Sequence, residues 1–476
     1  MVYRCVCTDA VLPNILACFA AALIEIASTS DRCRRNMGVN FVRLPRHVKS
    51  VHYAWVMLGI AIAMRLVSSV ERTASGVLVA YLVDPAGEFG WSRSVVGLAL
   101  SLQWICSGVF APPAGWLGDR YGLRLAMAVG ALLFLATSVL IGLVTVPWQF
   151  LLCFGILMSA ALAIFQVPLI TAVTMWFHKH LGVAMGLLQS AQGLANVLFA
   201  PLMVVLLTQL GWRWAFWGPG IVGGLLLLGL IRYFRNEPAE VGLRPLGADP
   251  KAPIRLVQKG PLARVRTTVF LQQARRTFAF WNLIGIHYWG CAGHAIIMVY
   301  LADIVRTQGL SLATGALVVS TMFGVSSFTR FAVPILADRV GSRSAMALCF
   351  CLQGLPIALL FWAHEAWHFY LFAVLFGIGF GGEMSAFPII NRQYYGDAPT
   401  GTVYGWQMLG AGIGMASGSF LGGVLRDLTG AYTLALGCSF VLSMMGTLSI
   451  LVLPSTAHHQ IPEWEKALSP EVRATT

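Results

Sequence analysis

Charged side chains are scarce in this chain, because only 11% of its 476 residues are Asp, Glu, Lys or Arg. A soluble domain carries roughly 25%. Hydrophobic residues make up 58% of the chain, and the mean hydropathy is +0.75. A water-soluble core cannot hide so much apolar surface, so the composition excludes a soluble protein and predicts an all-α membrane protein.

The chain also lacks the motifs of ATP-driven pumps and of hydrolytic enzymes. It has no G-x4-G-K-[ST] phosphate loop and no zinc-protease or serine-hydrolase pattern. Its ten cysteines include two isolated C-x-C pairs, Cys5/Cys7 and Cys349/Cys351, but no spacing typical of a metal site. We therefore predict no enzyme activity, no cofactor, no metal and no use of ATP.

Acidic residues are fewer than basic ones, 19 against 32, which gives a net charge of +13. The bases concentrate in predicted loops, with ten Lys or Arg against three acids over 232–276. Loop charge of this kind sets membrane orientation, so nucleic acid is not an expected partner. The positive-inside rule predicts that both termini and the central loop are cytoplasmic. The expected location is a bacterial inner membrane.

Apolar runs long enough to cross a hydrocarbon core of about 30 Å recur along the chain. They predict twelve transmembrane helices, near 53–83, 94–117, 122–144, 149–176, 181–209, 213–233, 279–303, 312–336, 343–362, 368–391, 400–425 and 431–453. Residues 1–50 form an N-terminal extension of open status. It is a signal-like segment, an interfacial helix, or sequence upstream of a true start such as Met37.

One short motif, Asp-Arg-x-Gly-x-Arg, occurs twice at an offset of 219 residues. The motif residues are Gly115, Asp119, Arg120, Gly122 and Arg124 in the first copy, and Asp338, Arg339, Gly341 and Arg343 in the second. The same offset relates several further pairs over some 120 residues, including Gly182 and Gly401. It divides the chain into an N-terminal bundle (51–236), a linker (237–277), a C-terminal bundle (278–455) and a tail (456–476).

Over residues 51–455 the chain resembles the major facilitator superfamily, and the duplicated motif carries the resemblance. Within that superfamily it is most similar to bacterial monocarboxylate transporters and oxalate/formate antiporters. The supporting residues are 89–93 (FGWSR), Trp176-Phe177, Gly211-Trp212-Arg213 and Arg330. The resemblance implies two six-helix bundles that alternate access to a central site, and it makes the motif a conformational latch. The alternative for the motif is plain topogenic charge.

Arg330 is the strongest candidate for a substrate contact. It lies eight residues before Asp338, which at 1.5 Å per residue is about 12 Å into the membrane. A cation there must face a cavity or a partner, and its repeat equivalent is Ala111. The resemblance implies that Arg330 holds a substrate carboxylate, and the alternative is a structural ion pair with Glu71 or Glu383. Ser326 and Gln407 replace an acid and a lysine of the related patterns, which favours one carboxylate over two.

Further polar side chains lie inside the apolar spans. Glu71 and Arg72 in the first helix are candidates for proton coupling and substrate binding, unless they simply neutralise each other. His287 and His294 fall at the repeat equivalents of Ser68 and Ser75, on one helical face. Other candidates are Tyr288, Gln166 and Gln407 for substrate and Glu383 for protons, although packing or interhelical hydrogen bonds also account for such residues.

We therefore predict a secondary transporter of small organic anions, with protons and the lipid bilayer as its other partners. Monocarboxylates fit best, and the expected mechanism is proton-coupled alternating access. One alternative is a drug/proton antiporter of the same fold, although the predicted fifth helix lacks the Gly-Pro pair of those antiporters. A second alternative, from another class, is a membrane sensor that binds a ligand without moving it.

Overall fold

The computed structural model describes residues 52–70, 82, 89–249, 251, 261–456 and 458–473. Ten of the described helices are long and apolar enough to cross a membrane, and Tyr53–Ser68 is a shorter apolar helix. The predicted fold class, an all-α membrane protein, is confirmed. Every one of the twelve predicted spans coincides at least in part with a described helix.

The N-terminal bundle contains the first six predicted spans. Its elements are α2 (Tyr53–Ser68), α5 (Arg93–Tyr121), α6 (Leu123–Gly142), α7 (Pro147–Phe150), η2 (Leu151–Leu157), α8 (Met158–Trp176) and α9 (Leu181–Tyr233). The fourth span is continuous through α7, the π-helical η2 and α8. The fifth and sixth spans form α9, which bends at Gly211, where φ is 79°. Glycine reaches this left-handed region without the Cβ clash of other residues.

The C-terminal bundle repeats this plan. Its elements are α11 (Phe278–Thr307), α12 (Leu312–Val340), α13 (Ser342–Gly354), η4 (Leu355–Phe361), α14 (Ala366–Tyr395), α15 (Gly401–Thr429) and α16 (Thr433–Leu451). Equivalent residues set equivalent helix starts. Ser92 caps α5 by accepting from the amide of Val95, and Ser311 caps α12 by accepting from the amide of Thr314.

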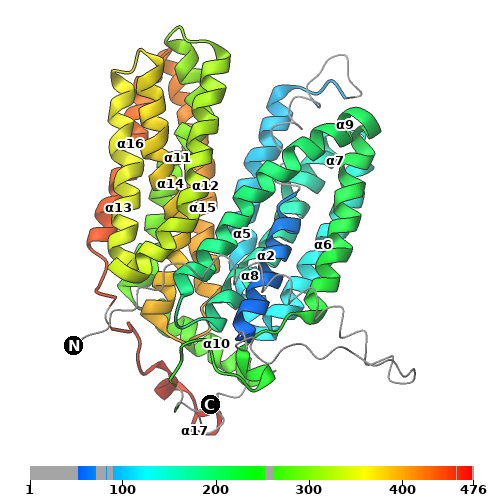
Figure 1. Ribbon diagram of the computed structural model, residues 1–476, viewed down its shortest axis with the longest axis vertical. Helices are drawn as coiled ribbons and strands as arrows, with labels where there is room; N and C mark the ends of the chain where they lie inside the picture. Colours follow the sequence, from blue (N-terminus) through cyan, green and yellow to red (C-terminus); the bar gives the residue numbers. More distant parts are fainter. Residues whose placement is uncertain are drawn as a thin grey trace, which may run out of the picture.

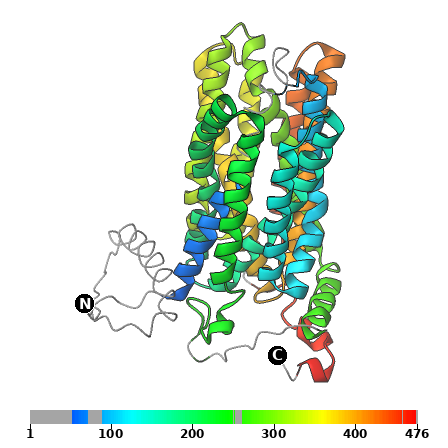
Figure 2. The same cartoon turned by 90° about the vertical axis from the view of Figure 1, so that its right-hand side faces the viewer.

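The linker and the tail carry short helices that pack on each other. These are η3 (Pro238–Val241), α10 (Pro261–Ala274), η5 (Trp464–Ala467) and α17 (Pro470–Arg473). Phe270 of α10 stacks edge-on against Tyr395 and Trp464, and Arg266 pairs with Glu465 at 2.7 Å. We call the end of the bundles at which α10 lies the linker end (Figures 1 and 2).

The two bundles stand side by side, with their helices roughly parallel (Figure 1). Their ribbons converge at the linker end and lie farther apart at the opposite end, where α7 begins. Large apolar side chains are exposed along the outside, among them Phe328, Phe420 and Leu428. An apolar exterior of this kind is what a hydrocarbon environment selects. The polar groups that could act on a solute are therefore sought inside the bundles and between them.

Candidate functional site

The bundles touch through glycine-lined helix pairs. A Cβ built on Gly115 of α5 would lie 2.1 Å from the carbonyl oxygen of Gly401 in α15, and one on Gly182 of α9 would lie 2.1 Å from that of Pro334 in α12. Both pairs therefore meet backbone to backbone, as small residues allow within a membrane. Gly182 and Pro334 are the repeat equivalents of Gly401 and Gly115, so the two contacts are related by the pseudo-twofold symmetry of the fold.

The aspartates of the duplicated motif bridge these same contacts. Asp119 accepts hydrogen bonds from the amides of Gly401 (3.1 Å) and Thr402 (2.6 Å) and from the Thr402 hydroxyl (2.8 Å). Asp338 accepts one from the amide of Gly182, at 2.8 Å. Each carboxylate thus caps the first turn of a helix in the other bundle, where the helix dipole favours a negative charge.

The basic motif residues act within their own bundles. Arg124 donates to the carbonyls of Ile231 (3.0 Å) and Arg232 (3.1 Å) at the end of α9, and Arg343 donates to Leu451 at the end of α16. Arg339 is exposed, and Arg120 stacks on Trp116. The motif glycines, Gly122 and Gly341, have φ of 100° and 89° and let each helix turn directly into the next.

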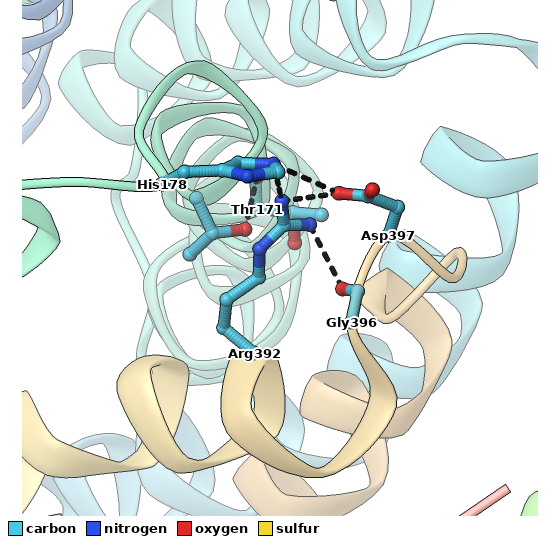
Figure 3. A network of polar contacts seen from close by, with 6 residues as sticks. Thr171, His178, Arg392, Gly396 and Asp397 are labelled. Carbon is cyan, nitrogen blue, oxygen red and sulfur yellow. Dashed lines mark hydrogen bonds and ion pairs between the residues drawn. The ribbon is translucent and has the colours of Figure 1, made fainter. Parts of the chain in front are cut away.

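A third bridge between the bundles joins two loops at the linker end (Figure 3). His178, before α9, lies 3.1 Å from Asp397, before α15, measured from Nε2 to Oδ1. Arg392 of α14 contacts both side chains and donates to the Gly396 carbonyl at 2.8 Å. His178 and Asp397 are 219 residues apart. Two repeat-equivalent residues that touch must lie on the pseudo-twofold axis itself.

Within the C-terminal bundle, a carboxylate is buried against an imidazole. The Nδ1 atom of His294 in α11 lies 3.0 Å from Oε2 of Glu383 in α14, and both side chains are at most 1% exposed. The Gln353 amide lies 2.6 Å from the same imidazole nitrogen. The Cys291 sulfur, an imidazole nitrogen of His294 and a carboxylate oxygen of Glu383 all lie within 4.8 Å of one another, and each atom type can bind a metal. Because the imidazole already pairs with the carboxylate, we treat the cluster as an acid–base site.

Arg330 of α12 lies close to this cluster. Its guanidinium carbon is 5.5 Å from the ring centre of Phe380, and the Phe380 ring is 5.0 Å from that of His294. Arg330 is partly exposed, and within the described part of the chain no carboxylate comes within ion-pair distance of it. A cation near the middle of a membrane helix is therefore left available to an anion.

Comparison with known proteins identifies the family. The family model described as Major Facilitator Superfamily matches residues 53–333 and 291–474. The chain belongs to the major facilitator superfamily. It is similar to the MFS-type transporter opdF of Penicillium oxalicum (26% identical over 76% of this chain and 81% of that protein). It is also similar to monocarboxylate transporter 11 of Homo sapiens (27%, covering 84% and 83%).

Solved structures show the same fold at low identity. The transporter FucP in the outward conformation superposes with a TM-score of 0.64 at 12% identity, over 83% of this chain and 97% of that one. The proton:xylose symporter XylE superposes with a TM-score of 0.62 at 14% identity, over 87% and 98%. The family match and the membrane-length helices show that this facilitator chain is a multi-pass integral membrane protein, and its family consists of transporters.

Among the described residues, the remaining predicted ones of this facilitator make no hydrogen bond, ion pair or ring contact with Arg330. His287 stacks on Phe387 with ring centres 3.8 Å apart, and Gln407 exchanges two hydrogen bonds with Asn391 at 2.8 and 2.9 Å. Tyr288 and Gln166 are partly exposed. Glu71 and Arg72 lie outside the described residues. All six stay predictions.

Sequence reasoning missed several partners that the fold assembles. Arg65 of α2 is buried and donates to Gln192 of α9 at 2.7 Å, although the sequence analysis does not select Arg65 as a site. Nothing in the sequence around Gln353 and Asn391 indicated that they would bind His294 and Gln407. The 219-residue offset, however, is a signal that would have paired His178 with Asp397.

In the bridge of His178 and Asp397, here called the axial bridge, the carboxylate should stay ionised across the physiological pH range. Burial acts to raise the pKa of Asp397, but the hydrogen bond from His178 and the charge of Arg392 outweigh it and hold that pKa well below its ordinary value. A depressed carboxyl pKa contributes stability above the ordinary pKa of about 3.9, which is lost only as pH falls through the lowered value. Stabilisation by this carboxylate is therefore complete from pH 5 to 8.

The corresponding test compares the melting temperatures of the native protein and Asp397→Asn. Because the carboxylate is partly exposed, we expect the variant to melt lower by no more than about 2 °C. In a His178→Gln background, where the neighbouring imidazole is absent, the difference should be the same at pH 5 and pH 8. A difference that changes across this interval would show that Asp397 titrates there.

Proposed function

We propose that this protein is a secondary transporter of small organic anions, and specifically of monocarboxylates taken up with protons. The observation that supports it most is Arg330, a guanidinium inside a membrane bundle that has no carboxylate within ion-pair distance among the described residues. A planar guanidinium binds one carboxylate through two parallel hydrogen bonds. The similarity to a protein named monocarboxylate transporter 11 supports the same substrate class.

The substrate would also remove an electrostatic penalty. A central arginine costs at least about 2.5–3.5 kcal/mol in a membrane unless it is paired or hydrated. A bound carboxylate supplies the missing negative charge, whereas an uncharged solute does not. The proposed site therefore favours anions over neutral analogues of the same shape.

Proton coupling follows from how near Glu383 lies to the anion site. Phe380 contacts both Arg330 and the imidazole that pairs with Glu383, and the charges of Arg330 and Glu383 interact. Protonation of Glu383 removes a negative charge that competes with the substrate for Arg330. Proton binding then strengthens anion binding, and by thermodynamic reciprocity the anion strengthens proton binding to the same degree.

Alternating access would be governed by the three bridges between the bundles. The carboxylates of Asp119 and Asp338 and the axial pair of His178 and Asp397 all join the bundles at the linker end, where the ribbons converge (Figure 1). We infer that the structure is closed at this end, and that the end is cytoplasmic because the basic loops gather there. The duplicated motif then acts as a latch, as breaking its caps favours the alternative state.

The proposed activity is tested by transport in proteoliposomes. Uptake of labelled lactate should accelerate when the outside is made acidic, and counterflow should occur without a gradient. The methyl ester of lactate and neutral drugs should not compete. Counterflow separates a transporter from a sensor, since a sensor binds without exchange. Transport of neutral or cationic drugs without carboxylate transport would favour a drug antiporter and reject our proposal.

Replacing Glu383 should separate exchange from accumulation. In Glu383→Gln the side chain keeps its size but cannot ionise, so a proton is neither bound nor released at this position. We expect lactate counterflow to persist while acid-driven accumulation falls at least about tenfold, as a proton-coupled cycle requires. Glu365→Gln, at the exposed start of the same helix, is the matched control and should accumulate lactate normally. Normal accumulation in Glu383→Gln would exclude this residue as the proton carrier.

A further inference from the structure

Two arginines from different elements meet on one tyrosine at the linker end. Arg120, in the last turn of α5, places its guanidinium carbon 4.8 Å from the Trp116 ring centre and 5.9 Å from that of Tyr121. Arg264, in the linker helix α10, places its own 4.8 Å from the same Tyr121 ring. We call Trp116, Arg120, Tyr121 and Arg264 the arginine-pair site.

Among the described residues, no acidic side chain neutralises either arginine. Across the described ranges, no side-chain hydrogen bond or ion pair reaches either guanidinium, and the Nε atoms of both are buried without a hydrogen-bond partner. The nearest acid in sequence, Asp119, is directed at α15 instead. Two like charges that share an aromatic ring, with buried donors unsatisfied, make a site that is incomplete without an anion.

The position of the site indicates where that anion comes from. Tyr121 is the last residue of a membrane-spanning helix, and Trp116 and Tyr121 are 37% and 42% exposed. Exposed Trp and Tyr at the end of a span typically lie at the level of the lipid headgroups. Leu125 and Val265, next to the site in sequence, are also exposed. An apolar exterior of this kind faces lipid, so a phospholipid can reach both arginines from the membrane.

We propose that the arginine-pair site binds the phosphate of an anionic phospholipid from the leaflet at the linker end. Guanidinium groups match phosphate oxygens in geometry and charge, while the two aromatic rings contact the glycerol and upper acyl region. The lipid would hold α10 against α5 beside the hydrogen bond that the Thr267 hydroxyl donates to the Asp119 carbonyl at 3.3 Å. This inference is independent of the transported substrate.

The test measures lipid binding to delipidated protein in detergent. Native mass spectrometry counts retained phosphatidylglycerol or phosphatidylcholine, and a thermal-shift titration with each lipid gives an affinity. Phosphatidylglycerol should bind and stabilise the native protein more than phosphatidylcholine does. Arg264→Gln should weaken phosphatidylglycerol binding about fivefold, the value of one basic residue near an anionic membrane surface. Arg276→Gln removes an exposed cation just beyond α10 and should leave binding unchanged.

Two further measurements complete the test. One distinguishes a lipid phosphate from free phosphate, and the other shows that lost binding does not come from a misfolded variant. Inorganic phosphate at millimolar concentration should not reproduce the stabilisation; if it does in native protein and not in Arg264→Gln, the ligand is free phosphate and the lipid source is wrong. Arg264→Lys keeps the charge but loses the planar fork, so its affinity should fall between native and Arg264→Gln. Equal phosphatidylglycerol affinity in native, Arg264→Gln and Arg276→Gln would overturn the proposal.

Discussion

Arg330→Gln is expected to lose lactate uptake almost completely while the protein stays folded. The native guanidinium would give the carboxylate two charge-assisted hydrogen bonds, each worth about 1.5–3 kcal/mol. Losing both should weaken carboxylate binding at least about 100-fold. Proteoliposome uptake measures the loss directly. The stabilisation of purified protein by added carboxylates, measured by thermal shift, should disappear with it.

The same variant distinguishes a substrate anchor from a structural residue. If Arg330 is an unpaired cation in the ligand-free state, its removal should leave the melting temperature of the ligand-free protein unchanged or raise it. A structural ion pair would instead make the variant melt well below the native protein. Arg306→Gln, at the exposed end of α11, is the matched control. Uptake in Arg330→Gln above about a tenth of the native rate would contradict the carboxylate anchor.

Asp119→Asn is expected to open the linker end far more than Asp338→Asn does. Asp119 accepts three hydrogen bonds across the bundles and Asp338 accepts one. Both substitutions remove a negative charge at a helix N-terminus, a contribution of about 0.3–1 kcal/mol that reaches about 2 kcal/mol when partly buried. For Asp119 we expect the upper part of that range, which shifts the ratio of closed to open states about 5- to 30-fold.

Spin labels introduced as unnatural amino acids at Tyr233 and Val340, exposed residues of opposite bundles, would report this change. Double electron–electron resonance should show a longer distance population that grows from native to Asp338→Asn to Asp119→Asn. Asp427→Asn, an exposed position at the other end of α15, should match the native protein. A larger effect in Asp338→Asn than in Asp119→Asn would contradict the unequal strength of the two caps.

Much of the fold could be predicted from the sequence because the membrane simplifies the problem. Hydrocarbon thickness fixes the length of each span, and the 219-residue repeat predicted that one half would copy the other. Both predictions agree with the helices and with the paired caps of Asp119 and Asp338. The predicted boundary between the fifth and sixth spans also agrees with the structure, because α9 is two helices joined at Gly211, whose φ of 79° and ψ of 178° are not helical.

The site was harder to predict because its contacts cross between helices whose facing surfaces the sequence does not specify. The spacing of His287 and His294 predicts that they share one face of α11, but it does not say that one stacks on Phe387 and the other meets Glu383. Gln353 and Asn391 each complete a pair with a residue of another helix. Only the packing of α11, α13, α14 and α15 defines those pairs.

The contact of His178 with Asp397 also bears on why the two halves of the chain must differ in sequence. In a symmetric dimer of identical six-helix units, a position on the twofold axis faces its own copy. Such a unit would bring histidine against histidine or aspartate against aspartate, and like charges repel. An imidazole opposite a carboxylate requires two different residues at one ancestral position. This bridge is therefore an interaction that two identical copies of one half could not make, and it depends on the divergence of the two halves at the axial position.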